Sequence, residues 1–244
     1  MLPSRIFLDD ASPETWADLL PTGIFHGVTT NPLILQKAKV KCEVSSISKL
    51  VFRALEEYPI REVMCHSWGG SADSLEANAA KLLDASGAQS LVIKLPLTKA
   101  GITAAHRLRG RDDGIRLCMT ACYSRTQAIA AAALGVAYLA PYLGRMTERF
   151  GKDGLLECLA MQEALSNMRA PTRLLVESLR DASTLFEVVK AGADGAFSAE
   201  VARQLLYVVE TEAAAHEFEI VACGEETTCL VDTIITAHSS SADY

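Results

Sequence analysis

Short apolar runs alternate with longer helix-like stretches along most of this 244-residue chain. This rhythm is typical of parallel strands that are buried on both faces and joined by crossover helices. Eight such units predict a closed (β/α)8 TIM barrel, a fold that usually takes about 250 residues. The predicted strands are Ile6 to Asp9, Gly27 to Thr29, Glu62 to His66, Ser90 to Lys94, Ile115 to Met119, Val136 to Ala140, Thr172 to Glu177 and Gly195 to Ser198.

Helix starts and stops lie between the predicted strands. Ser12 precedes Pro13, and Ser71 precedes the stretch from Ala72 to Ser86, so a capping hydroxyl stands before each first turn. Asp181 opens a similar run to Ala191, and the predicted stops are Gly87, Gly135 and Gly192. An open doubly wound sheet has the same rhythm, but no Gly-x-Gly-x-x-Gly turn follows the first strand, so the barrel is favoured.

No linker or low-complexity segment divides the chain. We therefore predict one catalytic barrel domain over residues 1–218 and a C-terminal extension over residues 219–244. From Glu219 to His238 the apolar pairs Leu230, Val231 and Ile234, Ile235 have helical spacing, and the final Ser-Ser-Ser-Ala-Asp-Tyr segment has the composition of a frayed end.

The charge balance makes small molecules the expected partners. A net charge of -7 is unfavourable for nucleic acid or for an anionic membrane. The uncharged stretch 126–144 is broken by Gly135 and Pro141, so it predicts a buried helix from Gln127 to Leu134 and a strand, not a membrane span. Acids at Asp9 and Asp10 exclude a signal peptide, so a cytoplasmic location is expected.

The cysteines give no sign of a metal site or a disulfide framework. They number seven, at positions 42, 65, 118, 122, 158, 223 and 229, and no Cys-x-x-Cys pair occurs among them. Reduced thiols are the simplest interpretation, and no metal or other cofactor is expected.

Lys94 lies in an apolar stretch, Ser90 to Thr98, that predicts a buried strand. A buried ammonium costs several kcal/mol unless it is paired or loses its proton. Either a carboxylate meets Lys94, or the lysine is neutral and able to attack a carbonyl carbon as a Schiff-base nucleophile. The alternative is that Pro96 ends the strand and Lys94 points outward at its tip.

Polar side chains stand at or just after the end of every predicted strand. In a barrel of this type these ends form the active-site mouth, so the side chains should face one another. They are Asp9, Thr29, Thr30, Asn31, His66, Lys94, Thr120, Tyr142, Arg145, Ser178, Arg180 and Ser198. The best candidates to bind a phosphate ester are Arg145, Ser178 and Arg180. One arginine can donate to two phosphate oxygens at once, and a hydroxyl can donate a further hydrogen bond.

Each of these residues also has an ordinary structural explanation. Asp9 could cap a helix, Asn31 before Pro32 could form a turn, and His66 and Tyr142 could belong to the core. Arg180 could be solvated, although arginine opposes the dipole at a helix N-terminus. Their convergence on one rim favours function.

Five motifs resemble those of the transaldolase family, particularly its short branch, which includes the fructose-6-phosphate aldolases. They are Phe-Leu-Asp-Asp near the start, Gly-Val-Thr-Thr-Asn-Pro at 27–32, Val-Ile-Lys-Leu-Pro-Leu-Thr at 92–98, Ala-Pro-Tyr-Leu-Gly-Arg at 140–145 and Glu-Ser-Leu-Arg at 177–180. The resemblance runs from about Ile6 to Glu217.

The resemblance implies a class I aldolase mechanism that acts on sugar phosphates. It also implies a place in carbohydrate metabolism related to the pentose phosphate pathway. Lys94 would form an imine with the ketone of a ketose phosphate, and Asp9 would take the proton from the C4 hydroxyl. Asn31 and Thr29 would hold the dihydroxyacetone unit until an aldose phosphate accepts it. Short members of the family assemble into rings through C-terminal helices, so a homo-oligomer is expected.

Two positions depart from the family's pattern. Near the end of the third strand the family has a glutamate or glutamine that orients the water that forms and breaks the imine, and this chain has His66. Tyr142, with Thr120 at the same water site, matches the aldolase branch, whereas transaldolases tend to have phenylalanine there.

Transfer of the three-carbon unit is the expected reaction. The first alternative is cleavage of fructose 6-phosphate to dihydroxyacetone and glyceraldehyde 3-phosphate. A second is an isomerase or lyase in which Lys94 acts only through its charge, and a third is a sugar-phosphate-binding protein without turnover.

Overall fold

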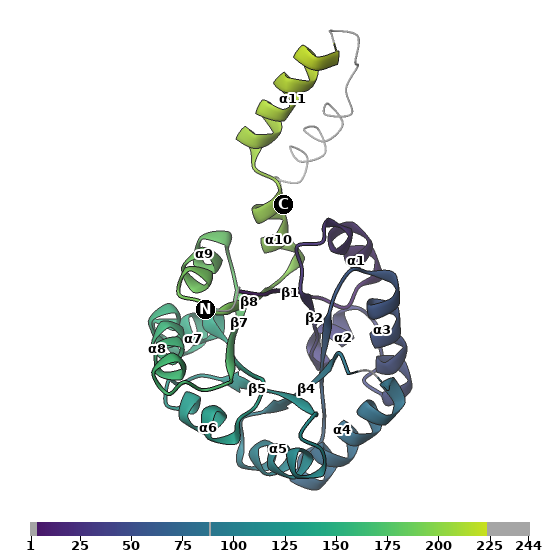
Figure 1. Ribbon diagram of the computed structural model, residues 1–244, viewed down its shortest axis with the longest axis vertical. Helices are drawn as coiled ribbons and strands as arrows, with labels where there is room; N and C mark the ends of the chain where they lie inside the picture. The colour runs from purple at the N-terminus through teal and green to yellow at the C-terminus, as the bar shows by residue number, and fades with distance from the viewer. Residues whose placement is uncertain (1–3, 88, 224–244) are drawn as a thin grey trace. The chain divides into compact units, whose positions relative to one another are not determined.

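Eight parallel strands close into one barrel in chain order, from β1 to β8, in the computed structural model of the protein (Figure 1). The structure describes residues 4–87 and 89–223. The strands are β1 Ile6–Asp9, β2 Gly27–Thr29, β3 Glu62–His66, β4 Leu91–Pro96, β5 Arg116–Cys122, β6 Tyr138–Pro141, β7 Arg173–Leu179 and β8 Asp194–Phe197. The predicted (β/α)8 barrel is therefore confirmed.

Helices cover the outside of the barrel (Figure 1). They are α1 Pro13–Leu19, the 3₁₀ turn η1 Leu20–Thr22, α2 Pro32–Lys37, α3 Val44–Glu57, α4 Ala72–Ser86, α5 Lys99–Arg111, α6 Gln127–Leu134, α7 Leu143–Phe150, α8 Gly154–Asn167 and α9 Ala182–Lys190. A further helix, α10 Ala199–Leu206, follows β8 in the chain. The hydroxyls of Ser12 and Ser71 and the carboxylate of Asp181 cap α1, α4 and α9 as predicted. No helix in the described part of the chain is long and apolar enough to cross a membrane.

Three strands end two or more residues later than the sequence predicts. β4 includes Pro96, which pairs with Thr120 on β5 at the end of the ladder. Proline has no backbone N–H to donate, and this loss is tolerated at the end of a strand. β5 and β7 continue through register shifts, and in each the residue at the shift, Ala121 or Ser178, has a positive φ. Alternating hydrophobicity does not reveal such bulges, which explains the shorter prediction. At β8 the difference is opposite, since the strand ends at Phe197 and Ser198 follows it.

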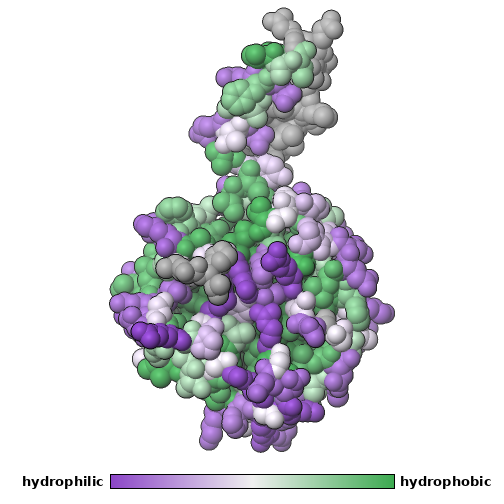
Figure 2. All heavy atoms as spheres, viewed as in Figure 1, coloured by the Kyte–Doolittle hydropathy of each residue, from purple (hydrophilic) through white to green (hydrophobic). Residues whose placement is uncertain are grey.

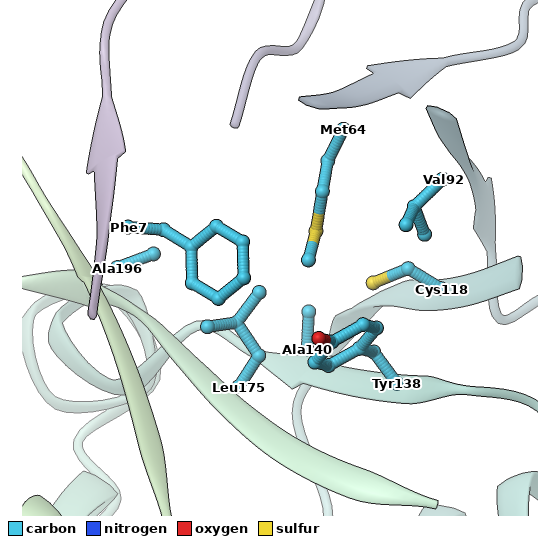
Figure 3. Packing of buried hydrophobic residues seen from close by; sticks show 8 residues of the cluster. All are labelled: Phe7, Met64, Val92, Cys118, Tyr138, Ala140, Leu175 and Ala196. Carbon is cyan, nitrogen blue, oxygen red and sulfur yellow. The ribbon is translucent and has the colours of Figure 1, made fainter. Parts of the chain in front are cut away.

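One layer of the barrel interior is apolar. Figure 3 shows its side chains pointing toward one another: Phe7, Met64, Val92, Cys118, Tyr138, Ala140, Leu175 and Ala196. β2 contributes Gly27 beside Phe7, and a Cβ there would lie 2.9 Å from the Phe7 ring and 2.1 Å from the backbone oxygen of Glu62. Glycine at this position is therefore what lets the phenylalanine ring fill the layer.

A charged network closes the end of the barrel at which the strands begin. Glu62, at the start of β3, accepts hydrogen bonds from Arg5 and from the Tyr138 hydroxyl at 2.9 and 2.7 Å, and its Oε1 lies 2.9 Å from His26 and from Arg116. Burial raises the pKa of this carboxyl, but its hydrogen bonds and Arg116 outweigh burial and lower the pKa to about 2. On the barrel face in view in Figure 2, hydrophilic side chains gather over the centre.

The chain divides into two compact units at Ala202 and Arg203. The second contains α11 Val209–Cys223, in which no side chain is buried and Val209, Phe218 and Val221 are strongly exposed. The boundary predicted between residues 218 and 219 lies inside this helix. The predicted helical pairs at Leu230, Val231 and Ile234, Ile235 lie outside the described residues.

Candidate active site

Six of the predicted site residues, together with Glu177, lie two positions after a residue of the interior layer. Side chains alternate along a strand, so the second residue after an inward one also points inward, one layer closer to the strand ends. The pairs are Phe7 and Asp9, Gly27 and Thr29, Met64 and His66, Val92 and Lys94, Cys118 and Thr120, Ala140 and Tyr142, and Leu175 and Glu177. The apolar layer is thus the floor of the site.

Lys94 is fully buried and is held by two neighbours. Its Nζ donates to Oγ1 of Thr29 at 2.7 Å and to Oε1 of Glu177 at 2.5 Å, and Glu177 is itself 2% exposed. Burial lowers the pKa of Lys94, but the combined effect of Glu177, Tyr142, Cys118 and Asp9, led by Glu177, outweighs burial and holds this pKa above its ordinary value. Of the alternatives left by the sequence, a carboxylate partner is therefore correct, and an outward-pointing lysine is excluded.

Glu177 is the site residue that the sequence interpretation missed. From the sequence alone it ends a predicted strand and opens a motif, without a role of its own. A signal was available: in Leu-Leu-Val-Glu, the glutamate follows the inward Leu175 by two positions, as Lys94 follows Val92. The same alternation that identifies the lysine therefore identifies its partner.

Asp9 is a second carboxyl at the same site, and its environment differs. Its Oδ1 is buried without a hydrogen-bond partner among the described residues. Burial, followed by the charge of Glu177, raises the pKa of Asp9 to about 7, although Lys94 acts in the opposite direction. Capping does not explain Asp9, because Ser12 caps α1 and Asp10 accepts the backbone N–H of Ser12. A carboxyl that titrates near neutral pH can both take and give a proton.

His66 pairs in register with Lys94 across β3 and β4. Its Nδ1 lies 2.5 Å from the backbone oxygen of Ser67. Because a carbonyl oxygen only accepts, Nδ1 must carry the hydrogen, which leaves Nε2 as an acceptor in the neutral ring. Burial, and then the charge of Lys94, lowers the pKa of His66 to about 4, so the ring is neutral at physiological pH.

Two hydroxyls of the site are joined by a hydrogen bond. Thr120 Oγ1 donates to the Tyr142 hydroxyl at 3.1 Å, so the structure brings together the two residues expected at one water site. Burial, and then the charge of Glu177, raises the pKa of Tyr142 to about 12, so this hydroxyl keeps its proton at neutral pH.

A cavity of about 90 Å³ opens at this end of the barrel. It is lined by Asp9, Asn31, Tyr142, Arg145, Glu177, Ser178 and Arg180. Arg145 stacks on the Tyr142 ring at 4.6 Å, and Ser178 has a buried Oγ without a partner among the described residues. Arg180 is exposed and makes a two-fold ion pair with Glu148 at 2.6 and 2.9 Å. The three residues expected to bind an anion therefore share one cavity, although Arg180 already has a carboxylate partner.

Three predicted residues remain, and the first of them, Thr30, is buried and donates to the backbone oxygen of Met64 at 3.1 Å. Asn31 lines the cavity while its Oδ1 caps α2 by accepting the N–H groups of Leu33 and Ile34. Ser198 is exposed and is not part of the cavity lining. Across the described residues no group of three or more histidine, cysteine or carboxylate side chains could hold a metal ion.

Comparisons with known proteins all point to the same family. A family model described as Transaldolase/Fructose-6-phosphate aldolase matches residues 6–194. A probable transaldolase of Caulobacter vibrioides (strain NA1000 / CB15N) is 32% identical over 195 residues, which cover 78% of this chain and 82% of that protein. A probable transaldolase of Methanococcus vannielii is also 32% identical, with 78% and 83% covered. Probable transaldolase 2 of Listeria monocytogenes is 30% identical, with 78% and 82% covered.

Proposed function

This chain belongs to the transaldolase/fructose-6-phosphate aldolase family of enzymes, and we propose that it transfers a dihydroxyacetone unit from a ketose phosphate to an aldose phosphate through an imine on Lys94. One observation carries the proposal: a fully buried lysine in the barrel mouth, held by a carboxylate and a hydroxyl, beside a second carboxyl that titrates with a pKa of about 7.

The reaction begins at Lys94. Its nitrogen attacks the ketone carbon, and loss of water gives a protonated imine, an electron sink that permits carbanion chemistry without a metal. Asp9 takes the proton of the C4 hydroxyl as the C3–C4 bond breaks. A pKa of about 7 suits this step, because a general base works best when its pKa is near the operating pH. The three-carbon unit then stays on Lys94 as an enamine, which Thr29 and Asn31 hold.

Water for imine formation and hydrolysis is handled by three side chains. His66 offers the Nε2 acceptor, while Thr120 and Tyr142 offer a joined pair of hydroxyls. A water between an acceptor and a donor has a fixed orientation, so its lone pair can face the imine carbon. We propose that His66 does here what a carboxylate or amide does at this position in other family members.

The phosphate group of the substrate binds at the cavity mouth. Arg145 and the unpartnered hydroxyl of Ser178 supply the main contacts. Arg180 joins them when a phosphate competes with Glu148 for its guanidinium group, since arginine binds either oxyanion in the same forked geometry.

Borohydride trapping tests the proposal. Reduction in the presence of fructose 6-phosphate should add a sugar-derived fragment to the Lys94 peptide, which mass spectrometry identifies. Lys94→Ala should abolish the adduct, whereas Lys99→Ala, at the exposed start of α5, should leave it intact. An adduct on another lysine, or none in the unaltered protein, would contradict the proposal and favour a charge-only role for Lys94 or a binding protein without turnover.

A product assay separates transfer from cleavage. With fructose 6-phosphate and erythrose 4-phosphate, transfer yields sedoheptulose 7-phosphate. Release of free dihydroxyacetone without the acceptor indicates aldolase-type cleavage instead, the outcome that Tyr142 favours by its resemblance to the aldolase branch. Assembly into a homo-oligomer and a cytoplasmic location stay predictions, and light scattering would measure the first.

A further inference from the structure

Glu177 touches the reacting nitrogen in the free protein. Its Oε1 lies 2.5 Å from Nζ of Lys94, and both side chains are buried. The same nitrogen also donates to the Thr29 hydroxyl at 2.7 Å. A protonated lysine cannot attack a carbonyl carbon, because its lone pair is held in an N–H bond. The imine reaction therefore needs a group that removes this proton.

Three neighbours could accept the proton, and the geometry separates them. Thr29 is a hydroxyl, which is far too weak a base at neutral pH. Asp9 has a buried oxygen without a partner among the described residues, so it is free to meet a substrate hydroxyl. Glu177 alone of the three is a carboxylate in direct contact with Nζ, and it also lines the cavity that a substrate enters.

The backbone holds Glu177 in this place. Glu177 forms a backbone bridge with Tyr142, and it lies with Ser178 in the register shift of β7 between Val176 and Leu179. Ser178, at the shift, has φ of 63°, a conformation that costs a non-glycine residue free energy and so persists only where the surrounding structure imposes it. The carboxylate therefore stands on a fixed strand end, not on a loop.

We propose that Glu177 is a catalytic residue that takes a proton from the Lys94 ammonium, returns it to the departing hydroxyl of the carbinolamine, and then balances the charge of the imine. This inference rests on the proposed imine chemistry at Lys94. It gives the two carboxyls of the site separate tasks: Glu177 serves the nitrogen, and Asp9 serves the carbon–carbon bond.

The steps balance without any further reactant. Glu177 removes one proton from the ammonium, and the free amine attacks the ketone carbon, so that the C–N bond forms and the carbonyl π pair moves to oxygen. The nitrogen gives a second proton to that oxygen, which becomes a hydroxyl. Glu177 returns the first proton to the hydroxyl, which leaves as water while the nitrogen lone pair completes the C=N bond. The protonated imine then faces the Glu177 carboxylate, as the ammonium did before.

Two measurements on Glu177→Gln test this role. The amide keeps the size and an acceptor oxygen but cannot take a proton. Quenched-flow borohydride trapping with fructose 6-phosphate should show imine formation about 100-fold slower or worse, the usual effect of losing a positioned acid or base. Labelling of Lys94 by cyanate without sugar should rise roughly 10-fold for each unit by which the pKa of the lysine falls, because only the free amine reacts.

The opposite directions of these two signals identify the proton transfer. A purely structural role would lower both trapping and labelling, and that result would overturn the proposal, as would trapping at the unaltered rate. Glu177→Asp keeps the charge at a greater distance and should trap at an intermediate rate, which provides a test if the glutamine variant does not fold. Glu187→Gln, the same change at a half-buried position on α9 outside the cavity lining, should alter neither signal.

The same design separates failure of this inference from failure of the proposed function. If the unaltered protein forms no trapped adduct at all, the imine chemistry is wrong. Cyanate labelling would in that case still decide whether Glu177 holds the Lys94 proton, because it needs no sugar.

Discussion

At the scale of single residues, the two carboxyl groups of the site differ in their hydrogen-bond partners. Glu177 accepts a hydrogen bond from Lys94, whereas Asp9 has a buried oxygen without a hydrogen-bond partner among the described residues. Two carboxyls beside one lysine thus have different environments, which suits the different proton-transfer tasks proposed for them.

Asp9→Asn should lower kcat by about 10² to 10⁴-fold, because the C4 hydroxyl loses its base. The pKa of Asp9 is about 7, so kcat/KM of the unaltered enzyme should rise with pH through 7 as this carboxyl ionises, and the variant should lose that limb. Trapping of substrate on Lys94 should persist, because the imine forms before the bond breaks. Asp10→Asn, which keeps the oxygen that accepts from Ser12, is the matched control. A variant with full turnover would remove Asp9 from the mechanism.

His66→Ala should slow hydrolysis of the imine by about 10²-fold, because water loses the Nε2 acceptor. The pKa of His66 is about 4, so the ring is neutral at working pH and its removal should delete no limb of the pH profile above 5. Single-turnover release of product measures the effect, with His66→Gln as a partial replacement and His106→Ala, exposed on α5, as the control. Unchanged release would restrict His66 to a packing role.

At the scale of elements, the mouth depends on a close approach between α7 and the end of β7. A Cβ on Gly144, in the first turn of α7, would lie 2.3 Å from the backbone oxygen of Ser178 and 3.0 Å from Nε of Arg180. The helix that carries Arg145 can therefore reach the strand that carries Ser178 only with glycine at this position.

Gly144→Ala should separate the two elements proposed to bind the phosphate group and raise KM for the sugar phosphate by about tenfold or more. The backbone contact cannot yield as a flexible side chain would, so the variant should also lose thermal stability. Gly110→Ala in α5 is the matched control: a Cβ there meets nothing within 4 Å, and alanine favours a helix. Equal effects of the two substitutions would show that the contact at Gly144 does not shape the site.

Periodicity predicts some parts of this site and not others. Alternation along a strand places Asp9, Lys94 and Thr120 on the inward face of their strands from the sequence alone. It cannot reveal the bulges at Ala121 and Ser178, because a positive φ leaves no mark in a pattern of apolar and polar residues. Nor does it show that Arg180 meets Glu148, since these two residues are brought together only by the approach of α7 to β7.

At the scale of the whole barrel, the alternation of strands and helices in the sequence predicts the fold. The two ends of the barrel differ in how their carboxyl groups are paired. Glu62 at one end is satisfied by Arg5, His26, Arg116 and Tyr138, whereas Oδ1 of Asp9 at the other end is buried without a hydrogen-bond partner in the described part of the chain. The apolar layer of Figure 3 lies between the two ends. The sequence does not reveal that four side chains converge on Glu62, because they come from four separate segments of the chain.

Removal of the negative charge at each end should change the stability of the fold in opposite directions. Glu62 has a pKa of about 2, below its ordinary value, so it stabilises the fold above its unfolded pKa, and this stability is lost as the pH falls toward 2. Asp9 has a pKa of about 7, above its ordinary value, so the stability it permits at low pH is lost as the pH rises through 7.

Glu62→Gln should therefore lower Tm at pH 7 by roughly 5 °C or more while kcat is unchanged, because a buried charge network loses its carboxylate far from Lys94. Asp9→Asn should raise Tm at pH 8 by roughly 3 °C or more while kcat falls, and the gain should vanish near pH 4, where Asp9 is already protonated. Scanning calorimetry at both pH values measures these shifts. If Asp9→Asn were less stable than the unaltered protein at pH 8, the buried carboxyl would not be a source of strain, and its assignment as the base of the reaction would lose its physical ground.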